Sequence, residues 1–372
     1  MGYVAVKGGT KAIDEAIKRL THERIKNGKV LNVNDIESGF RSLIDQVMSE
    51  SSLYCRKLSS IALKQAEGSP EEAVFLLRAY RSTLPRNHYS SIIDTKNMSV
   101  ERRISASFKD IPGGQILGAC LDYTHRLIDF DLVRESDQDI LDWIQSYKNE
   151  AQEEIDPEKA DQLKKMPRVG EMLIQQGLMT NKEEDNTDPQ DVTKEIVQFP
   201  SSRSQRLQIL TRGITGAVIA FGYAAIRGYG AYHPTVAELR IGYLSIYIDD
   251  PLGENLEEDV FFIGEIQVTE VETLFPVQVN KKNGVKEIKF DMGYGICFGQ
   301  NESKAIAMSV LDHCLSIGNK EYPTHNEEFV LLHIDSVEAT GFISHLKLPH
   351  YVTFQSELDS VRKTKNPLLN HE

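Results

Sequence analysis

The stretch from Lys286 to Gly299, KEIKFDMGYGICFG, repeats its apolar side chains with a period of two. The large ones fall at even positions, namely Ile288, Phe290, Met292, Tyr294, Ile296 and Phe298. Alternate residues of an extended strand face the same side, so this pattern predicts a long strand with one face turned toward a core. A sheet is therefore expected in the second half of the chain.

The residues before this strand predict its partners. Asn283-Gly284 is a dipeptide that favours a tight hairpin turn, and FFIGEIQVTEVETL, residues 261–274, is a second strand candidate. YLSIYID, residues 243–249, alternates in the same way. Because hairpins join antiparallel strands, we expect an antiparallel sheet.

Helical patterns come mostly earlier in the chain. YVAVKGGTKAIDEAIKRL predicts a short strand, a glycine turn and a helix capped by Thr10, and helical patterning continues to about residue 82. Ser69-Pro70-Glu71-Glu72 starts one of these helices with a capping box. Later helices are expected at SRSQRLQILTRG, capped by Ser204, and at NESKAIAMSVLDHCLSIG, ended by Gly318. Grouped helices followed by hairpin-connected strands indicate the α+β class.

Charge divides the chain into three predicted regions. Residues 134–200 carry 17 acidic and 8 basic side chains, whereas the whole chain of 372 residues has a net charge of -13. We interpret 134–200 as an acidic flexible insertion or linker between a mainly helical region, 1–133, and an α+β region, 201–372. Arginines gather outside it, as in RAYRSTLPR, where Arg78 and Arg81 lie three residues apart and therefore close together on a helix.

Composition favours a soluble cytoplasmic protein. The chain is 40% hydrophobic, and its longest apolar-rich run, residues 215–226, is too short to cross a bilayer. The N-terminus lacks the features of a signal peptide. The four cysteines are scattered without a CxxC pair, which argues against a disulfide framework or a zinc ribbon.

Three glycine-bearing loops, VKGGTK, KDIPGGQ and RGYGAYHP, have charged residues beside them. Glycines after a strand let backbone N–H groups face an anion, although each loop can equally be an ordinary turn. The charged and polar residues in or next to the last two loops are Asp110, Asp122, His125, Arg126, Arg227, His233, Glu238 and Arg240. Buried ion pairs would explain any two of them, whereas a functional site would explain several together.

His345 and His350 stand on either side of a chain bend in SHLKLPHYVTF. A spacing of five brings two side chains together on neither a helix nor a strand. Pro349 fixes its own φ and favours an extended Leu348, so the chain bends and both rings can turn to one point. The pair is thus either half of a metal site or two unrelated histidines, one buried and one solvated.

Long motifs of the chain resemble a known family. RRISASFKDIPGGQILGACLDYTHRLIDF, RGYGAYHP, EFVLLHIDSVEATGFISHLKLPHYVTFQSEL and the opening YVAVKGG are similar to the PhnI subunit family of bacterial carbon-phosphorus lyase. The resemblance extends from near residue 3 to about residue 360.

The resemblance implies a ribosyl transfer within a larger assembly. Proteins of this family displace the purine of ATP or GTP at the anomeric carbon by an alkylphosphonate, which gives ribose 1-alkylphosphonate 5-triphosphate. Partner subunits G, H, J, K and L are implied, as is nucleosidase activity of the subunit alone. A transition state with oxocarbenium character needs a carboxylate near the sugar, an acid for the leaving base and cations for the phosphates.

Specific residues of this chain are assigned to these roles as a hypothesis. The catalytic candidates are Glu238, Asp122 and His125, and the substrate-binding candidates are Lys7, Arg126, Arg227 and Arg240. The resemblance also implies zinc at His345 and His350, shared with the J subunit. Two alternatives stay open: a non-catalytic core subunit of the lyase complex and a zinc-dependent hydrolase.

Overall fold

The structure, a computed structural model, describes residues 7–106, 123–154, 167–179, 187–228, 233–249, 260–280, 286–319 and 321–365. Packing divides it into two compact units, each assembled from separate parts of the chain. Unit 1 contains Met1–Asn87, Pro189–Phe221 and Gly318–Glu372, and unit 2 contains His88–Asp188 and Gly222–Ile317. The combination of helices with an antiparallel sheet confirms the predicted α+β class.

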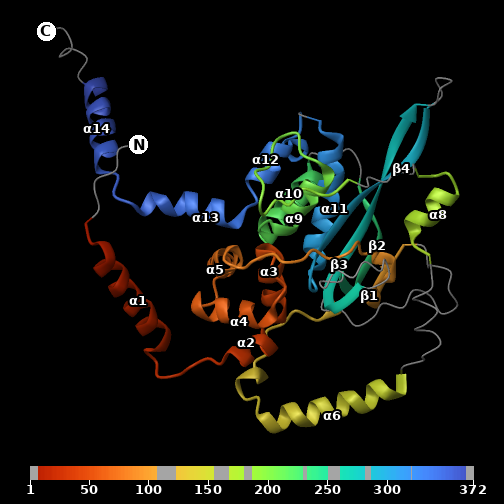
Figure 1. Cartoon of the computed structure of the whole chain (residues 1–372), viewed down its shortest axis with the longest axis horizontal. Helices are drawn as coiled ribbons and strands as arrows, with labels where there is room; N and C mark the ends of the chain where they lie inside the picture. Colours follow the sequence, from red (N-terminus) through yellow and green to blue (C-terminus); the bar gives the residue numbers. More distant parts are fainter. Residues whose placement is uncertain are drawn as a thin grey trace. The chain divides into compact units, whose positions relative to one another are not determined.

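Unit 2 is built on the antiparallel sheet (Figure 1). Its strands are β1 (Ser99–Ser105), β2 (Thr235–Asp249), β3 (Val260–Asn280) and β4 (Lys286–Phe298), in the spatial order β1-β2-β3-β4. The predicted hairpin is confirmed by the pairing of Asn280 with Lys286. Asn283 and Gly284, the predicted turn, lie outside the described residues.

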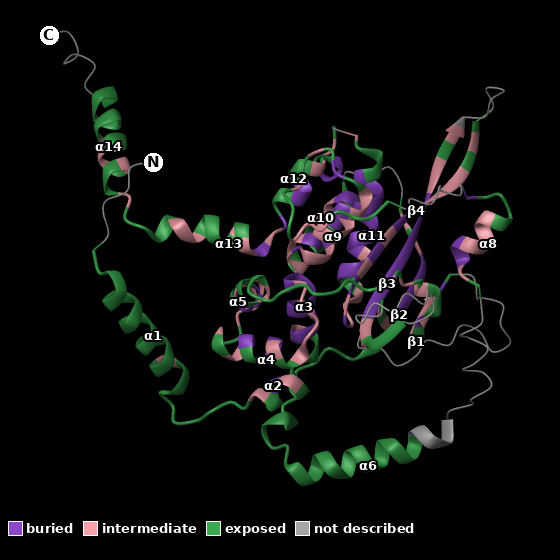
Figure 2. Ribbon diagram, viewed as in Figure 1, coloured by how far each residue is buried: buried purple, intermediate pink, exposed green. Residues whose placement is uncertain are grey.

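Helix α11 (Glu302–Ile317) covers one face of this sheet, and both are buried where they meet (Figure 2). The fully buried positions of β4 are the odd ones, Gly293, Gly295 and Cys297, whereas the even apolar positions are exposed or half-buried. A Cβ at Gly295 would lie 2.1 Å from the carbonyl oxygen of Ala305. The strand is as predicted, but the predicted buried face is wrong. The most buried face carries the glycines, and their lack of a side chain lets α11 pack closely against it.

The predicted linker contains ordered elements in unit 2. Helix α6 (Asp137–Glu154) is followed later by α8 (Val169–Gln175), and short 3-10 turns η1 (Thr95–Asn97) and η3 (Asp131–Val133) complete the described elements of the unit. Val169 and Met179 pack with Ala237 and Leu274 of the sheet. Part of the acidic stretch therefore belongs to the core of unit 2. The two units are each assembled from separate parts of the chain, so they do not correspond to the predicted regions 1–133, 134–200 and 201–372. That division stays a prediction.

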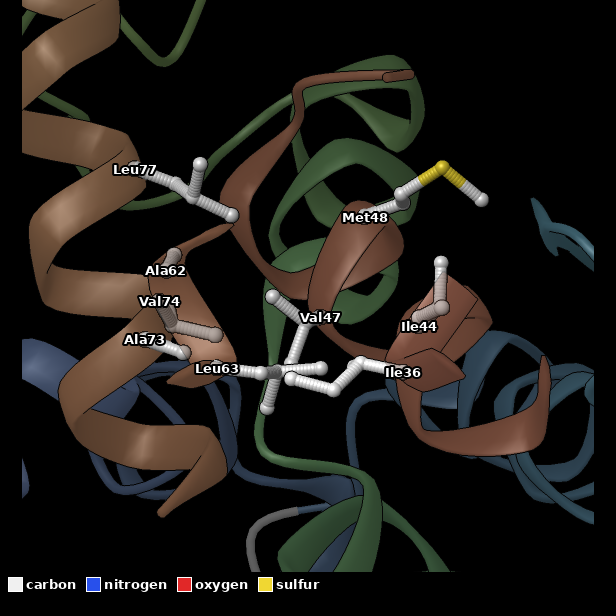
Figure 3. Close-up of a cluster of buried hydrophobic side chains, with 9 residues drawn as sticks. All are labelled: Ile36, Ile44, Val47, Met48, Ala62, Leu63, Ala73, Val74 and Leu77. Carbon is white, nitrogen blue, oxygen red and sulfur yellow. The ribbon is translucent and has the colours of Figure 1, made fainter. Parts of the chain in front are cut away.

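Unit 1 contains the helices before residue 88 and those near the C-terminus. They are α1 (Gly9–Ile25), α2 (Val33–Gly39), α3 (Arg41–Ser51), α4 (Arg56–Gln65), α5 (Pro70–Ser82), α9 (Arg203–Arg212), η4 (Pro323–His325), α12 (Glu327–Leu332), α13 (Ser336–Ser344), η5 (His345–Lys347) and α14 (Tyr351–Lys365). Helix α10 (Thr215–Arg227) runs from unit 1 into unit 2. Helices α2 to α5 share a core of nine buried apolar side chains, which Figure 3 shows together.

Helix starts test the predicted caps. Ser69 caps α5 by accepting from the backbone N–H of Glu72, as predicted. The cap of α9 is Ser202 and not Ser204, because Ser202 forms a reciprocal capping box with Gln205. The N-cap position of α1 is Gly8 and not Thr10. None of the helices among the described residues is long and apolar enough to span a membrane.

Candidate functional site

Glu238 and Arg240 lie on one face of β2, and they are the centre of a buried polar cluster in unit 2. Both side chains are buried. Across the sheet, Glu238 is in register with Glu272 of β3, and Arg240 is in register with Glu270. Side chains opposite each other on adjacent strands meet on the same face, so strand pairing brings three carboxylates together.

Glu238 is held as an ion pair, but its partner is Arg103 of β1. Arg103 donates from Nε (2.9 Å) and from Nη2 (2.7 Å) to the two carboxylate oxygens. The hydroxyl of Ser105 donates at 2.9 Å, and the backbone N–H of Val169 donates at 3.2 Å. A bidentate guanidinium with two more donors fixes both the charge and the orientation of this carboxylate.

Glu270 is the partner of Arg240. Arg240 Nε donates to it at 3.0 Å, and the hydroxyls of Thr95 and Tyr294 donate to its other oxygen at 2.6 and 2.8 Å. Burial, reinforced by Glu270, raises the pKa of Tyr294 well above its usual value. Tyr294 is therefore a neutral donor, and Glu270 is a fully bonded carboxylate.

Glu272 differs from the other two carboxylates because one of its oxygens has no partner. Arg168 Nη1 donates to Oε1 at 3.1 Å, whereas the buried Oε2 has no hydrogen-bond partner among the described residues. This oxygen would lie 3.3 Å from a Cβ at Gly170. Burial, opposed by Arg168 and assisted by Glu270 and Glu238, raises the pKa of Glu272 to about 7. Glu272 can therefore gain or lose a proton near neutral pH.

Residues 167–171, at the start of α8, cover the cluster. Arg103 Nη2 donates to the carbonyl oxygen of Pro167 at 3.0 Å, and Arg168 Nη2 donates to the hydroxyl of Thr95 at 2.7 Å. Lys96 and Glu171 form an ion pair at 2.8 Å. Because Arg168 also contacts Glu272, the cover and the proton-holding carboxyl are linked through one guanidinium.

The other predicted site residues are placed as follows. Lys7, His125, Arg126 and Arg227 are exposed, Arg227 as the last residue of α10. Asp122 lies outside the described residues, as does Asp110. His233 is exposed, two residues before β2 begins. Of the predicted catalytic and substrate-binding residues, the described structure brings Glu238 and Arg240 into one cluster.

Sequence reasoning missed most of the cluster. Its other members are Thr95, Arg103, Arg168, Glu270, Glu272 and Tyr294. One signal was available: Glu270 and Glu272 stand two residues apart in the predicted strand, which places two carboxylates on one face. Arg168 gave no such signal, since it comes from the acidic stretch interpreted as a linker.

His345 and His350 lie close together in unit 1, where the predicted bend is present. The chain passes from η5 through Pro349 into α14, and the two ring centroids are 6.0 Å apart with the planes at 74°. A tetrahedral zinc ion about 2.0–2.1 Å from two imidazole nitrogens places the ring centroids roughly 5 Å apart. The observed separation is longer than this, and Nδ1 of His345 is in hydrogen-bond contact with the carbonyl oxygen of Phe342, so metal binding by the pair stays a prediction. Among the described residues, no group of three or more metal-ligating side chains is present.

Comparison with known proteins gives the class of the chain. Residues 2–368 match the family model described as "Bacterial phosphonate metabolism protein (PhnI)". A relative from Escherichia coli (strain K12), named as alpha-D-ribose 1-methylphosphonate 5-triphosphate synthase subunit PhnI, is 41% identical over 97% of this chain and 98% of its own. The subunit of the same name from Rhizobium meliloti (strain 1021) is 41% identical over 98% of this chain and 95% of its own.

A third relative, from Stutzerimonas stutzeri, is named as a candidate C-P lyase subunit, HtxH, and is 40% identical over 98% of this chain and 96% of its own. Fold and site thus belong to a phosphonate metabolism protein. The chain is a member of the PhnI family.

Proposed function

We propose that this chain carries the site at which an alkylphosphonate displaces the purine base of ATP or GTP at ribose C1′. The product is ribose 1-alkylphosphonate 5-triphosphate, and water replaces the phosphonate when the chain acts alone. The names of the relatives, subunits of a 5-triphosphate synthase, support this reaction. In the cell the chain would work in the cytoplasm with the G, H, J, K and L subunits of carbon-phosphorus lyase.

The state of Glu272 is the observation that carries the proposal. Departure of a purine requires a proton at the base, and a buried carboxyl with a pKa of about 7 holds one near neutral pH. Its Oε2 is the oxygen without a partner among the described residues, so this oxygen is the one that would carry the proton. Glu272 therefore takes the role of general acid, which the sequence left unassigned.

The neighbouring groups fit the remaining roles. Glu238 is held in place by hydrogen bonds from Arg103 and Ser105, and a carboxylate in this position would stabilise the positive charge that develops on the ribose. Ala106, which follows β1, is hydrogen-bonded to Ala237, which precedes Glu238, at 2.9 Å. KDIPGGQ and part of RGYGAYHP lie outside the described residues, and Arg126, Arg227 and Arg240 stay the candidates for phosphate contacts.

Zinc is proposed at the other predicted pair, His345 and His350. The two rings supply half of a tetrahedral set, so a partner chain, the J subunit in this proposal, or water supplies the other half. The ion would add Lewis acidity toward phosphonate oxygens at that contact. A zinc-dependent hydrolase built on this pair alone is the less favoured alternative, because the described residues add no third ligand.

A non-catalytic core subunit is a second candidate, favoured by one observation. Both oxygens of Glu238 and both oxygens of Glu270 accept hydrogen bonds within the cluster, as structural ion pairs do. Buried pairs of this kind also occur where no chemistry takes place. The two candidates differ in whether Glu272 matters for turnover.

The experiment is base release by the purified chain. ATP is incubated with the chain, and chromatography separates free adenine and ribose 5-triphosphate. We expect slow adenine release that diverts to the phosphonate adduct when methylphosphonate and the partner subunits are added. Glu272→Gln should lower release at least tenfold, about 1.4 kcal/mol in the barrier. Glu265→Gln, an exposed glutamate on the same strand, is the matched control.

Inorganic phosphate without free base would contradict the reaction and indicate ester or anhydride hydrolysis. Adenine release that survives Glu272→Gln would keep the reaction and remove Glu272 from it. No release by the chain, alone or with its partners, would favour the non-catalytic subunit.

A further inference from the structure

The carboxylate cluster of unit 2 is closed in the described structure. The side chains of Glu238, Glu270 and Glu272 are only 2%, 2% and 6% exposed. A Cβ at Gly170 would lie 3.3 Å from Oε2 of Glu272, so a single methyl group would already press against this oxygen. Gly170 belongs to the cover, residues 167–171. A ligand larger than water can therefore reach Glu272 from this side only when the cover moves.

The cover contacts all three carboxylates through polar groups. The backbone N–H of Val169 donates to Glu238 at 3.2 Å, and Nη1 of Arg168 donates to Glu272 at 3.1 Å. Nη2 of Arg168 lies 3.6 Å from an oxygen of Glu270. Only two residues of α8 are buried, one of them a glycine. Since water can replace hydrogen bonds at little net cost, these contacts hold the cover less firmly than a large apolar interface would.

The short turn η1 holds the cover at its solvent edge. The ammonium of Lys96 and the carboxylate of Glu171 form an ion pair at 2.8 Å, and the two side chains are 59% and 33% exposed. The hydroxyl of Thr95 accepts a hydrogen bond from Nη2 of Arg168 at 2.7 Å. An exposed ion pair contributes little to stability, so this contact is easily broken and formed again. We call the Lys96–Glu171 pair the latch.

The other end of α8 is fixed to β4. The backbone N–H of Phe290 donates to the carbonyl oxygen of Leu178 at 2.9 Å, and Met179 pairs with Phe290 in a parallel bridge. Met179 is also buried in an apolar core against the sheet. Gly177, between α8 and this anchor, has a φ of 69°, and no described atom lies within 4 Å of its Cβ position. Glycine changes conformation at low cost, so the chain can turn here without displacing a neighbour.

We propose that α8 together with the cover forms a lid over the carboxylate cluster, which turns about Gly177 and is closed by the latch. Opening withdraws Arg168 and Val169 from the carboxylates and gives a ligand access to Glu272. Closing over the ligand excludes water from the proton that Glu272 holds. That the ligand is a nucleoside triphosphate rests on the proposed function, whereas the motion rests on the contacts of the cover alone.

Hydrogen exchange of the full chain, followed by mass spectrometry, tests the motion. The amides of residues 169–176 should exchange by opening of the lid, whereas those of residues 268–274, in β3, require unfolding of the sheet. Glu171→Gln and Lys96→Met each break the latch and should accelerate exchange at 169–176 about two- to fivefold, with exchange at 268–274 unchanged. Lys96→Glu combined with Glu171→Lys should restore the parent rate. Glu15→Gln, which breaks an exposed ion pair on α1, is the matched control.

Adenine release tests whether opening admits the ligand. Lys96→Cys and Glu171→Cys are combined and joined by a short bis-methanethiosulfonate reagent, and mass spectrometry confirms the bridge. The bridged chain should release adenine from ATP at least tenfold more slowly than the same variant before bridging, and dithiothreitol should restore the release. The parent chain treated with the same reagent is the control for its own cysteines.

Exchange at 169–176 that is unchanged in both latch variants, or that rises equally at 268–274, would overturn the lid. Adenine release by the bridged chain at the unbridged rate would do the same. Absence of adenine release by the parent chain contradicts the proposed function alone, and hydrogen exchange then decides the lid. If the cysteine variant fails to fold or to form the bridge, exchange in Glu171→Gln decides the lid in the same way.

Discussion

Glu238 and Glu272 face each other across β2 and β3, yet their surroundings give them different chemistry. Glu238 accepts hydrogen bonds from a bidentate arginine, a serine hydroxyl and a backbone N–H. Glu272 has one arginine hydrogen bond, and its other oxygen is buried without a hydrogen-bond partner among the described residues. Glu238 therefore has both oxygens bonded, whereas Glu272 can hold a proton.

The shifted pKa of Glu272 predicts how stability depends on pH. Burial raises the pKa from an ordinary 4.5 to about 7, so the folded state binds the proton more tightly than the unfolded state. The contribution of Glu272 to stability is therefore full below pH 4.5 and falls as the pH rises to 7. Glu272→Gln, which cannot ionise, should stabilise the chain at pH 8 by up to about 3 kcal/mol and change little at pH 5.

Chemical denaturation at both pH values measures this difference. Glu265→Gln, exposed on the same strand, should leave the pH dependence as it is. Equal stability of parent and Glu272→Gln at pH 8 would mean that Glu272 ionises without cost and is not a proton-holding group.

For individual residues, the sequence predicted part of the site. Glu238 and Arg240 were both predicted as site residues, and β2 brings them together on one face. The partner of Glu238 could not be predicted, because Arg103 reaches it through the register of β1 on β2, and register depends on packing that no local pattern records. The spacing of Glu270 and Glu272 indicates a shared strand face, but only the register of β3 on β2 places them opposite Arg240 and Glu238.

At the scale of helices and strands, the contact between β4 and α11 depends on two glycines of β4, which have no side chain. At Gly293 and Gly295 a Cβ would lie 2.0 and 2.1 Å from carbonyl oxygens of α11, far inside van der Waals contact. The helix backbone can approach the sheet this closely only over glycine. The alternation in KEIKFDMGYGICFG predicted the strand correctly, but hydrophobicity gives no signal for a face made of glycine.

Gly295→Ala should therefore destabilise unit 2. The added methyl group must push α11 from the sheet, and overpacking of this kind costs about 3 kcal/mol or more. Gly341→Ala on α13 is the matched control, since no atom lies within 4 Å of its Cβ position and alanine favours helix. Thermal unfolding followed by circular dichroism measures both. A Gly295→Ala chain as stable as the parent would mean that α11 and the sheet do not pack as described.

The N-caps of α5 and α9 show how far the local sequence determines where a helix begins. Ser69 with Pro70 and Glu72 was predicted as a helix start because every donor and acceptor of that motif is local. For α9 the predicted cap, Ser204, is wrong, because the side chain of Gln205 accepts from the backbone N–H of Ser202 and makes Ser202 the cap. A reciprocal contact of this kind decides which of two nearby serines begins the helix.

For the whole molecule, the chain interlaces two units that sequence position does not separate. Unit 2 takes β1 from before residue 189 and β2 to β4 from after residue 221, and unit 1 takes the intervening segment. A cut at the predicted boundary 200/201 would separate β1 from β2, its partner strand. Assignments of function to this family member therefore require the complete chain.

The last helices of unit 1 suggest where the whole molecule meets a partner. Helix α14 has no buried residue, and Phe342, Leu346 and Tyr351, close to His345 and His350 in sequence, are exposed. The two imidazoles leave a tetrahedral ion half-coordinated, so a zinc ion there needs ligands from outside the described residues. We expect the ion to bind tightly only in the assembled complex.

The double variant His345→Ala, His350→Ala tests this expectation. It should lose zinc in the assembled complex, while adenine release by the isolated chain stays within about twofold, because the proposed acid lies on β3 and not at the histidines. Elemental analysis of the complex measures the metal, and His22→Ala, on the exposed α1, is the control. Full zinc occupancy in the double variant would mean that the two histidines do not bind the ion and that the bend at Pro349 has only a structural role. Loss of adenine release together with the zinc would instead place the histidines in the reaction, and Glu272 would then no longer account for it by itself.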